Sequence, residues 1–580
     1  MQNGNRKGIA QWSKTYAGKK FYTSILFLAL PIILLVTFTF IPALDMVIFS
    51  FQNRDPYGTN PTYAGFSNYV TIFTDKDYLE TFKNSLYYLV GSFIQQALAL
   101  LLASILCSKI RAKGLFKGIL FFPYLMNGVA VSIIFQRFFL KGQKGLTPDG
   151  TLNTILTTLG LDPILWFDVD KPFLANCCLV FISIWKYIGF DIIMYIGAIQ
   201  SISPDLYEAA DLDGANPWQN FRYIVFPSIK PIISLQLILA VKGAISVFEI
   251  PYITTKGMMG TTTFVIKTIN TAFSLKKVGL ASAMGIVLLI ITIIAQNENK
   301  DSKPLYIGSR VLNIFKYVFL ILCCLIVIVP ILVVLIGSLK TYKELSNTTV
   351  FTLPEVPQWE NFKTAFFTQN ILLAFKNTAI IIVVSCVGSI ITGTMTAYVV
   401  QRFNTYFSRV VKTAFLIATL LPNITMQVTV FQIVYKLGLY RSMLAPIILN
   451  IGTDIISIYI FIQFLGQISY SLDESAIMDG ASYPRVYFSI ILPNLKPAIA
   501  TVLIIKFVGI YNDFYTPKLY MPDDDHVVIS TVLYNLMNAT SVQWEVVFAG
   551  IVICIIPTLI IFLLLQKYIY SGLVSGAVKE

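Results

Sequence analysis

Two stretches of this 580-residue sequence share one pattern: DLYEAADLDGANPWQNFRYIVFPSIKP at residues 205–231 and SLDESAIMDGASYPRVYFSIILPNLKP at residues 471–497. They align without a gap at an offset of 266 residues. Identical residues in the two copies include Glu208 and Glu474, Ala210 and Ala476, Asp213-Gly214-Ala215 and Asp479-Gly480-Ala481, Pro227 and Pro493, and Lys230-Pro231 and Lys496-Pro497. A repeat of this length indicates that the chain is built from two similar halves.

Each copy predicts a short helix, a turn and a second short helix. In the first copy Asp205 is an expected N-cap, with Glu208 three residues later in the position of a capping box. Gly214 can adopt the left-handed conformation that ends a helix, and Asn216-Pro217 can begin the next one. The second copy places Ser471, Glu474, Gly480 and Ser482 at the same points. Both copies could be well-capped connectors, or they could present a pair of identical loops to a partner with twofold symmetry.

The composition identifies a lipid bilayer as the solvent of this chain. Hydrophobic residues make up 56% of the sequence and charged residues 13%, which is about half the usual share of a soluble domain. The net charge of +13 does not indicate nucleic-acid binding, because the basic residues form no stripe interleaved with aromatic residues. They cluster in polar segments between apolar runs, as is typical of cytoplasmic loops: Arg6, Lys7, Lys14, Lys19 and Lys20, then Lys109, Arg111, Lys113 and Lys117, then Arg402, Arg409 and Lys412.

Twelve apolar runs are long enough to cross the bilayer, which takes about 20 helical residues. Eight are uncharged: 21–44, 84–108, 118–136, 278–295, 317–339, 377–401, 413–435 and 546–566. Four are interrupted by isolated charges: 173–200, 228–252, 442–466 and 494–515. Barrel strands are excluded because they would be about ten residues long with alternating polarity. We therefore expect an all-α polytopic membrane protein with two homologous six-helix halves.

A polar segment, QNENKDSKPLYIGSR at residues 296–310, separates the sixth run from the seventh. We expect a first half at residues 1–300, which contains the loop 205–231, and a second half at residues 301–580, which contains the loop 471–497. If the basic segments lie inside, both loops and both termini face the cytoplasm.

The two loops resemble the cytoplasmic EAA loop of permease subunits of ABC-type importers. That motif is Glu-Ala-Ala, a glycine six residues after the glutamate, a hydrophobic residue ten residues later and a proline three residues after that. The first copy has Glu208-Ala209-Ala210, Gly214, Ile224 and Pro227, and the second has Glu474, Ala476, Gly480, Ile490 and Pro493, with Ser475 in place of the first alanine. The resemblance implies a type I ABC importer permease fold. It assigns ATPase coupling to Glu208, Ala209, Ala210, Asp213, Gly214, Glu474, Ala476, Asp479 and Gly480.

The form EAADLDGAN is similar to that of the maltose-type carbohydrate importers. Similarity to the two permease subunits of that family extends over both halves. It includes Gly65-Phe66-Ser67-Asn68-Tyr69, Lys83-Asn84-Ser85 and Phe122-Pro123, then Lys376-Asn377-Thr378, Leu421-Pro422, Tyr511-Asn512-Asp513-Phe514 and Gly576-Ala577-Val578-Lys579. The resemblance implies that two usually separate subunits are fused here and that they transport a sugar or oligosaccharide.

The resemblance also implies the partners. The sequence has no P-loop, since its one Gly-Lys pair, Gly18-Lys19, is followed by Lys20. We therefore expect a transport component, not an enzyme, that binds no cofactor or metal itself. Two separate cytoplasmic ABC ATPase subunits would use ATP and Mg²⁺ and receive the EAA loops. An extracellular or periplasmic solute-binding protein would deliver the carbohydrate to this multi-pass protein of the bacterial cytoplasmic membrane.

Charged residues inside membrane segments are candidates for the substrate path, because burying them in lipid is costly. Lys242 and Glu249 fall in the fifth run, and Lys506 and Asp513 fall in the eleventh at nearly the repeat offset. Each pair is seven residues apart, or about 10 Å along one helix face. The candidate path consists of Lys242, Phe248, Glu249, Tyr252, Lys506, Tyr511, Asn512 and Asp513, with Asp191 and Asp454 as further acids. The alternative is that the charges form interhelical ion pairs or lie at the membrane interface.

Two alternative functions stay open at this point. The chain could be an ABC permease for a non-sugar solute, or an ion-coupled secondary transporter, which can also have twelve helices in two halves. The duplicated loop favours the ABC permease. A membrane enzyme is disfavoured because the seven cysteines have no CxxC spacing and His526 is the single histidine.

Overall fold

The structure is a computed structural model that describes residues 15–56, 61–108, 110–143, 149–297, 313–368, 370–403, 405–452, 454–538 and 542–577. It contains two compact units, each made of two chain segments. Unit 1 comprises Met1–Ile48 and Ala379–Ile510, and unit 2 comprises Phe49–Thr378 and Tyr511–Glu580. The predicted division near residue 300 lies outside the described residues, as do Arg6, Lys7, Lys14, Lys109, Val578 and Lys579.

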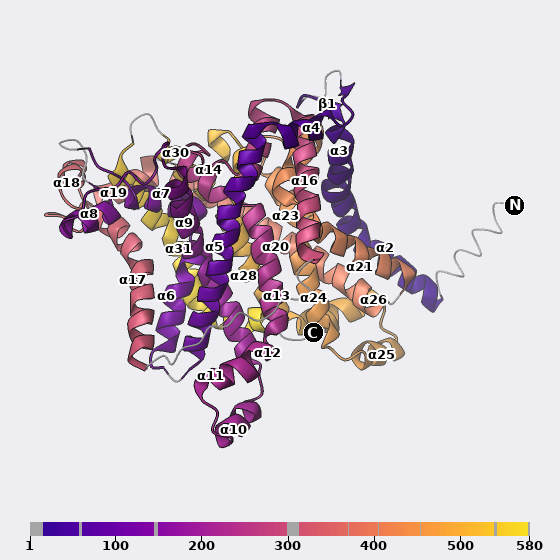
Figure 1. The fold of residues 1–580 in the computed structure, drawn as a ribbon. Coiled ribbons are helices and arrows are strands. Elements are labelled where there is room, and N and C mark those ends of the chain that lie inside the picture. The colour runs from indigo at the N-terminus through magenta and orange to yellow at the C-terminus, as the bar shows by residue number, and fades with distance from the viewer. Residues whose placement is uncertain are drawn as a thin grey trace. The chain divides into compact units, whose positions relative to one another are not determined.

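Unit 2 is a helical body with one short antiparallel hairpin, in which Gln52 pairs with Tyr63 and Asn53 with Thr62 (Figure 1). Its elements are β1 (Gln52–Asn53), β2 (Thr62–Tyr63), α4 (Ser67–Thr74), α5 (Lys76–Cys107), α6 (Lys113–Leu125), α7 (Gly128–Phe138), α8 (Thr151–Thr158), α9 (Pro172–Gln200), α10 (Pro204–Leu212), α11 (Pro217–Asn220), η2 (Phe221–Val225), α12 (Phe226–Ser228), α13 (Lys230–Ile245), α14 (Glu249–Thr255), α15 (Phe264–Ile269), η3 (Asn270–Ser274), α16 (Val278–Asn297), α17 (Asn313–Ser338), α18 (Tyr342–Asn347), α19 (Glu360–Lys363), η5 (Thr364–Thr368), α29 (Tyr515–Tyr520), η7 (Asp524–His526), α30 (Ile529–Met537) and α31 (Trp544–Ala577).

The described residues of unit 1 form helices joined by turns and loops, with no strand among them. Its elements are α2 (Tyr16–Leu35), η1 (Val36–Phe40), α21 (Tyr406–Leu420), α22 (Asn423–Lys436), α23 (Leu444–Gly452), α24 (Ile455–Gly466), α25 (Ser471–Met478), α26 (Tyr483–Val486), η6 (Tyr487–Ile491) and α27 (Leu492–Asn494). Three helices begin in one unit and end in the other: α3 (Ile41–Ser50), α20 (Ile371–Arg402) and α28 (Lys496–Asn512).

The predicted membrane helices are present. Among the described residues, eight helices are long and apolar enough to cross a bilayer: Gly18–Ser50, Lys76–Cys107, Pro172–Gln200, Lys230–Thr255, Lys316–Ser338, Ile371–Arg402, Leu444–Gly466 and Trp544–Leu564. Three bent pairs raise this number to eleven if each is one span: α6 with α7 at 100°, α21 with α22 at 109°, and Tyr483–Asn494 with α28 at 72°. The shorter apolar helix Val278–Ile294 occupies the remaining predicted run. The expected all-α polytopic membrane fold is confirmed, with bends that the sequence analysis did not include.

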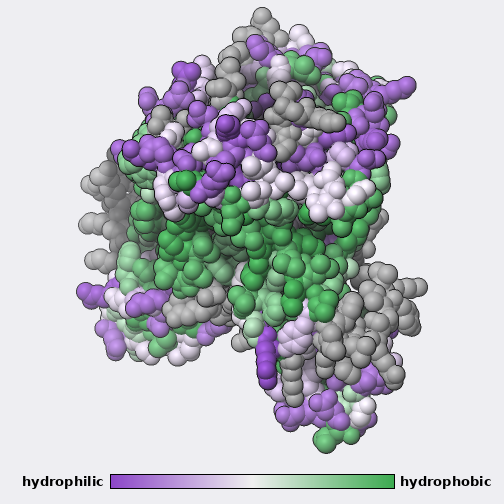
Figure 2. All heavy atoms as spheres, turned by 90° about the vertical axis from the view of Figure 1, so that its left-hand side faces the viewer, coloured by the Kyte–Doolittle hydropathy of each residue, from purple (hydrophilic) through white to green (hydrophobic). Residues whose placement is uncertain are grey.

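An apolar zone crosses the face of the molecule that carries α17. Figure 2 shows this zone in green, with hydrophilic purple zones above and below it. Helix α17 exposes Val318, Ile321, Leu322, Leu325 and Leu332, each by 46–58% of its surface. A helix that presents so many apolar side chains outward requires an apolar surrounding, which a bilayer provides.

The breaks inside the bent pairs follow from local sequence. Leu421 adopts an extended conformation with ψ of 136°, as expected for a residue that precedes proline, and this ends α21. Met126 is likewise extended with ψ of 142°, and the Asn127 side chain then accepts a hydrogen bond from the Val129 amide at 2.8 Å. Asn127 thus caps α7 and fixes the start of a new helix inside the membrane segment.

The first membrane helix of each sequence half packs among helices of the other half. Phe27 of α2 contacts the rings of Tyr398 in α20 and Tyr487 in η6, at centroid distances of 6.1 and 4.9 Å. In unit 2, the Trp185 indole of α9 donates to the carbonyl of Ile326 in α17 at 3.1 Å. Each compact unit therefore combines residues from both sides of the predicted boundary near residue 300.

A matching pair of asparagines supports the homology of the two halves. Asn84 in α5 donates to the backbone carbonyl of Thr262 at 2.9 Å. Asn377 in α20 donates to the carbonyls of Asp525 and Val527 at 3.1 and 2.9 Å. Both asparagines lie in the Lys-Asn-Ser/Thr segments of the sequence, and both tie the start of a long membrane helix to a distant backbone segment.

Candidate functional site

The duplicated segments form two loops with the same order of elements. Loop A, residues 204–228, contains α10, α11, η2 and α12, and loop B, residues 471–494, contains α25, α26, η6 and α27. The first helices, α10 and α25, end at Leu212 and Met478, and the following membrane helices, α13 and α28, begin at Lys230 and Lys496. Between these points, every helix in loop B begins and ends 266 residues after its counterpart in loop A. The sequence repeat is therefore also a structural repeat. In Figure 1, α10 and α11 project from one end of unit 2.

Each loop turns at a glycine with a left-handed backbone. The φ angle is +73° at Gly214 and +88° at Gly480, as predicted. The Ala215 amide donates to the Ala210 carbonyl at 2.9 Å, and the Ala481 amide donates to the Ala476 carbonyl at the same distance. These bonds form the helix-ending pattern in which a glycine reverses the chain direction. A side chain at either glycine would enter open space, so the requirement for glycine is conformational, not steric.

The predicted caps of the first helices are wrong. Helix α10 begins at Pro204, and Ser203 caps it by accepting from the Asp205 amide at 3.3 Å. Proline favours the first helical position because it has no amide hydrogen to leave unsatisfied, and this moves the cap from Asp205 to Ser203. Helix α25 begins at Ser471 itself, so Ser471 is not its cap. Glu208 and Glu474 therefore do not close capping boxes.

The second-helix caps are confirmed in one loop only. The Asn216 side chain accepts from the amides of Trp218 and Gln219 at 3.0 and 2.9 Å. Ser482 directly precedes α26, but its side chain accepts no hydrogen bond from the amides of the first turn.

The predicted coupling residues lie mostly on exposed surface. Glu208, Ala209, Asp213 and Gly214 are exposed in loop A, and so are Glu474, Asp479 and Gly480 in loop B, whereas Ala210 and Ala476 are half-buried. Two residues that the sequence analysis missed share this surface: Leu212 is 90% exposed and Met478, its counterpart, is 86% exposed. Their signal was available, because both repeats have an apolar residue directly before Asp-Gly.

The membrane charges do not lie on continuous helix faces, which corrects the prediction for Lys242 and Glu249 and for Lys506 and Asp513. Helix α13 ends at Ile245, and Glu249 begins α14 after a break. Helix α28 ends at Asn512, directly before Asp513. Counted from the shared starts of α13 and α28, Lys506 is equivalent to Ala240, not to Lys242. Two residues rotate a helix by about 200°, so the two lysines point to opposite helix faces.

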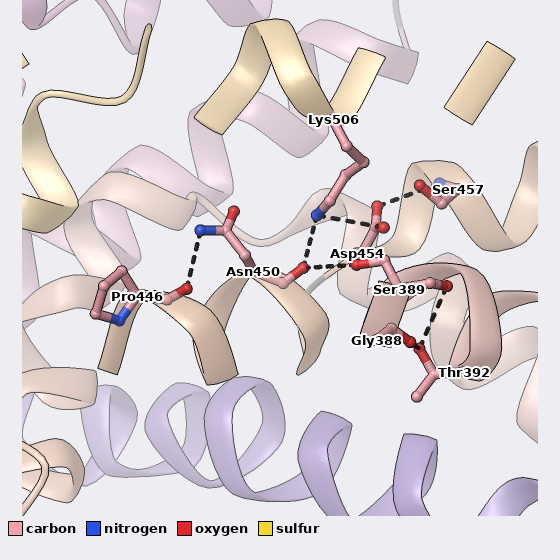
Figure 3. A network of polar contacts seen from close by, with 8 residues as sticks. All are labelled: Gly388, Ser389, Thr392, Pro446, Asn450, Asp454, Ser457 and Lys506. Atoms are coloured by element: carbon pink, nitrogen blue, oxygen red, sulfur yellow. Dashed lines mark hydrogen bonds and ion pairs between the residues drawn. The ribbon is translucent and has the colours of Figure 1, made fainter. Parts of the chain in front are cut away.

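Lys506 belongs to a polar network in unit 1 (Figure 3). Its ammonium lies 3.3 Å from the Asp454 carboxylate and donates to the Asn450 carbonyl at 2.6 Å. Asp454 also caps α24 by accepting from the Ser457 amide at 3.3 Å. The network thus joins α28 to the segment between α23 and α24, because Lys506 contacts both Asn450 of α23 and Asp454, the cap of α24.

In unit 2, Glu249 forms an interhelical ion pair with Lys186 of α9 at 3.1 Å. The Lys186 side chain is 3% exposed and the Glu249 side chain 23% exposed. A Cβ at Gly128, the first residue of α7, would collide with the Glu249 carboxylate. The acid therefore lies against a helix N-terminus, where the helix dipole stabilises negative charge. The sequence analysis did not include Lys186, although it is a charged residue inside an apolar run, as Lys242 and Lys506 are.

Polar residues from further helix breaks gather at the same place. The side-chain amide of Asn127 donates to the Tyr511 carbonyl at 3.2 Å, and the side-chain amide of Asn512 donates to the Leu125 carbonyl at 3.3 Å. Asp513 accepts from the Thr516 amide at 3.1 Å and lies within electrostatic range of Glu249. We name Asn127, Lys186, Glu249, Asn512 and Asp513 the polar cluster.

Aromatic rings link two of these breaks. Phe248 stacks on Tyr252 at 4.8 Å and meets Tyr515 edge-on at 4.9 Å. Phe514 contacts Tyr252 and Tyr534 at 6.3 and 4.9 Å. Burial raises the pKa of Tyr534 in α30 to about 12, so its hydroxyl stays neutral and can donate and accept hydrogen bonds. Of the predicted path residues, the structure brings together Phe248, Glu249, Tyr252, Tyr511, Asn512 and Asp513, but places Lys506 in the separate network of unit 1 and Lys242 on α13.

The remaining predicted acid, Asp191, is held by amides. Its carboxylate accepts from Gln95 at 2.6 Å and from Gln236 at 3.2 Å. These bonds join α9 to α5 and α13. No group of three or more metal-ligating side chains occurs among the described residues.

Comparison with known proteins gives one family twice along the chain. Residues 95–297 and residues 389–574 match the model described as binding-protein-dependent transport system inner membrane component. The first match ends at residue 297, at the start of the polar segment 296–310, and the second begins after that segment; the two matches include loops A and B, respectively.

Individual relatives are about half as long as this chain. The chain is 32% identical over 278 residues to the probable starch degradation products transport system permease protein AmyC of Thermoanaerobacterium thermosulfurigenes, a match that covers 47% of this chain and 100% of the relative. It is 32% identical to the osmoprotective compounds uptake permease protein GgtC of a Synechocystis species, over 45% of this chain and 92% of the relative. It is 30% identical to the lactose transport system permease protein LacF of Rhizobium radiobacter, over 40% of this chain and 76% of the relative. A whole relative thus matches less than half of this chain, as expected for two fused permeases.

Proposed function

Because the chain belongs to the family of binding-protein-dependent transport system inner membrane components, we propose that it forms the membrane path of an ATP-driven importer for a sugar or oligosaccharide. The observation that carries the proposal is the pair of loops A and B, which repeat the same turn around Gly214 and Gly480. Two copies in one chain supply two docking elements, so a second permease subunit is not needed.

Loops A and B contact one cytoplasmic ABC ATPase subunit each in this proposal. The contact surface consists of Glu208, Ala209, Ala210, Asp213 and Gly214 in loop A and of Glu474, Ala476, Asp479 and Gly480 in loop B, joined by the exposed Leu212 and Met478. The apolar side chains enter grooves of the ATPase subunits, and the glycine turns hold them in place. ATP and Mg²⁺ are bound by those subunits, and this chain itself catalyses no reaction.

The substrate path includes the polar cluster and the aromatic rings beside it. Sugars are bound by aromatic faces together with planar polar groups, and Tyr252, Asn512 and Asp513 offer both at breaks in membrane helices. Helix breaks are suited to this role because polar backbone at membrane depth is tolerated where it lines a path or is buried in protein. Lys186 neutralises the charge of Glu249, which lowers the free-energy cost of placing a carboxylate inside a membrane segment.

Transport follows alternating access. ATP binding closes the ATPase subunits, loops A and B move with them, and the path opens to the outside, where an extracellular or periplasmic solute-binding protein delivers the sugar. Hydrolysis reverses the movement. The protein lies in the bacterial cytoplasmic membrane with both termini in the cytoplasm, as the basic segments predict.

The energy source can be tested in the host cell. A strain that lacks this chain is complemented with the wild-type gene, and uptake of radiolabelled maltotriose and lactose is measured. We expect uptake to stop when arsenate depletes ATP and to continue when a protonophore collapses the ion gradient. Uptake that survives arsenate but not the protonophore would contradict the proposal and indicate a secondary transporter.

One relative supports a second substrate class, because it is named for osmoprotective compounds. The same strain pair distinguishes the two classes. Radiolabelled glycine betaine, added as a competitor and as a substrate, should neither be taken up nor reduce sugar uptake. Uptake of glycine betaine with no uptake of either sugar would assign a non-sugar solute.

A further inference from the structure

Loops A and B differ in how firmly they are held by the membrane helices, although their backbones match. In loop A, α10 has no buried residue, and the π-helical segment η2 has one, Val225. In loop B, α25 buries Asp473 and α26 buries Tyr483 and Val486, and η6 buries two further residues. The difference lies inside one chain, so each loop serves as a reference for the other.

The attachment of loop B starts at a buried ion pair with the end of α20. The guanidinium Nε of Arg402 lies 3.2 Å from the Asp473 carboxylate, and the side chains are 6% and 3% exposed. Arg402 also donates to the carbonyl of Ile468 at 2.9 Å, which fixes the segment that enters loop B. Burial raises the pKa of Asp473, and the charge of Arg402 opposes this shift. Asp473 directly precedes Glu474, so the ion pair lies at the base of the coupling surface.

Two further contacts connect α20 and its end to the second part of loop B. The Phe403 ring packs edge-on against Tyr483 of α26 at 5.0 Å. The hydroxyls of Thr394 in α20 and Tyr487 in η6 share a hydrogen bond of 2.7 Å. Together with the ion pair, these contacts join α25, α26 and η6 to α20 and to Phe403, the residue that directly follows it.

The repeat offset shows what loop A has at the same positions. The counterpart of Asp473 is Tyr207, which has no charge to pair with an arginine. The counterpart of Tyr487 is Phe221, which has no hydroxyl for a hydrogen bond. The side chains that hold loop B are therefore absent from the equivalent sites of loop A.

We propose that Arg402 and Asp473 are positioning residues that lock loop B to α20, so that loop B moves as one body with the membrane helices while loop A adjusts to its ATPase partner. The inference rests on the proposed function, because it assumes that both loops contact ATPase subunits. The two loops then differ in role. Loop B transmits the movement that opens and closes the path, and loop A follows through its own backbone connections to α9 and α13.

The test is the ratio of sugar taken up to ATP hydrolysed, measured with the purified transporter complex and its binding protein in proteoliposomes. The probe is maltotriose or lactose, whichever the wild-type complex transports. We expect Asp473→Asn and Arg402→Gln to lower this ratio about tenfold, a usual size for coupling between sites. The exchange Arg402→Asp with Asp473→Arg should restore most of the ratio. Tyr207→Phe, at the equivalent site of loop A, should leave the ratio unchanged.

The ratio separates positioning from simple loss of protein. If Asp473→Asn lowers uptake and hydrolysis in proportion, or leaves both unchanged, the inference is wrong. If that variant does not assemble, Tyr487→Phe replaces it, because it removes only the hydroxyl and gives loop B the residue type of Phe221. A normal ratio in Tyr487→Phe would then overturn the inference. A wild-type complex without ATP-driven uptake would contradict the proposed function instead.

Discussion

The Lys186 ammonium lies 3.1 Å from the Glu249 carboxylate and ties α9 to the break that precedes α14. Unit 1 contains a similar connection with the charges reversed, since Asp454 caps α24 and pairs with Lys506 of α28. In both halves, an ion pair joins the fourth membrane segment to the fifth. The charges are thus neutralised in pairs, which is the arrangement that lipid burial favours.

The ion pair of Lys186 can be tested by removing one charge. Lys186→Met leaves the Glu249 carboxylate without its partner, and breaking a mostly buried pair in this way costs about 3 kcal/mol. We expect a lower apparent Tm in detergent. The double variant Lys186→Met with Glu249→Leu should recover most of the loss, because no lone charge is left. A single variant as stable as the wild type would show that the pair contributes nothing.

Gly128 should be intolerant of any side chain. Gly128→Ala places a methyl group where the Glu249 carboxylate lies, so the acid must move away from the N-terminus of α7. Overpacking of this kind costs about 1–3 kcal/mol, and uptake should fall with it. Gly118→Ala in the preceding helix is the matched control, because its Cβ would meet Phe562 at an ordinary 3.7 Å. Equal Tm and uptake in both variants would contradict the described contact.

Asp513 should act on the affinity for sugar. Asp513→Asn keeps the shape of the side chain but removes the charge that strengthens hydrogen bonds to substrate hydroxyls. We expect the KM for uptake to rise about tenfold while the amount of protein in the membrane stays the same. Asp162→Asn, on an exposed segment, serves as the control. An unchanged KM in Asp513→Asn would remove this residue from the path.

The loop glycines should be needed for their backbone conformation. Gly214→Val and Gly480→Val place a branched side chain at a positive φ, which costs about 1–2 kcal/mol at each turn. We expect loss of uptake with the permease still present in the membrane. Gly243→Ala in α13 is the control, because that glycine is helical and a Cβ there meets nothing within 4 Å. Full uptake by both valine variants would show that the turns are not required.

Much of the fold could be predicted because membrane helices and repeats leave strong signals. The twelve apolar runs reflect the thickness of a bilayer, and the 266-residue offset reflects two copies of one loop. The positive φ of Gly214 and Gly480 followed from the one residue type that adopts it without strain.

The polar cluster could be predicted only in part, because it depends on helix breaks. A continuous helix would have placed Lys242 and Glu249 on one face, but the chain unwinds between Ile245 and Glu249. Pro251, in the first turn of α14, is a local signal of this break because a helix interior does not tolerate proline, and the predicted run over residues 228–252 did not take it into account. The partner of Glu249 is Lys186, 63 residues earlier, and such a pairing is decided by tertiary packing.

The central claim is that loops A and B each contact an ATPase subunit, and cross-linking from Leu212 and Met478 tests it most directly. Leu212→Cys and Met478→Cys are introduced one at a time, and native membranes with each variant are treated with a thiol-specific cross-linker. Membranes that contain the parent chain are treated in parallel as the control. The cross-linked partner is identified by mass spectrometry. We predict that both positions, but not Leu353→Cys at another exposed site (72% exposed), attach to a polypeptide that contains a P-loop. If neither loop position attaches to such a polypeptide while uptake is intact, the proposed function is contradicted.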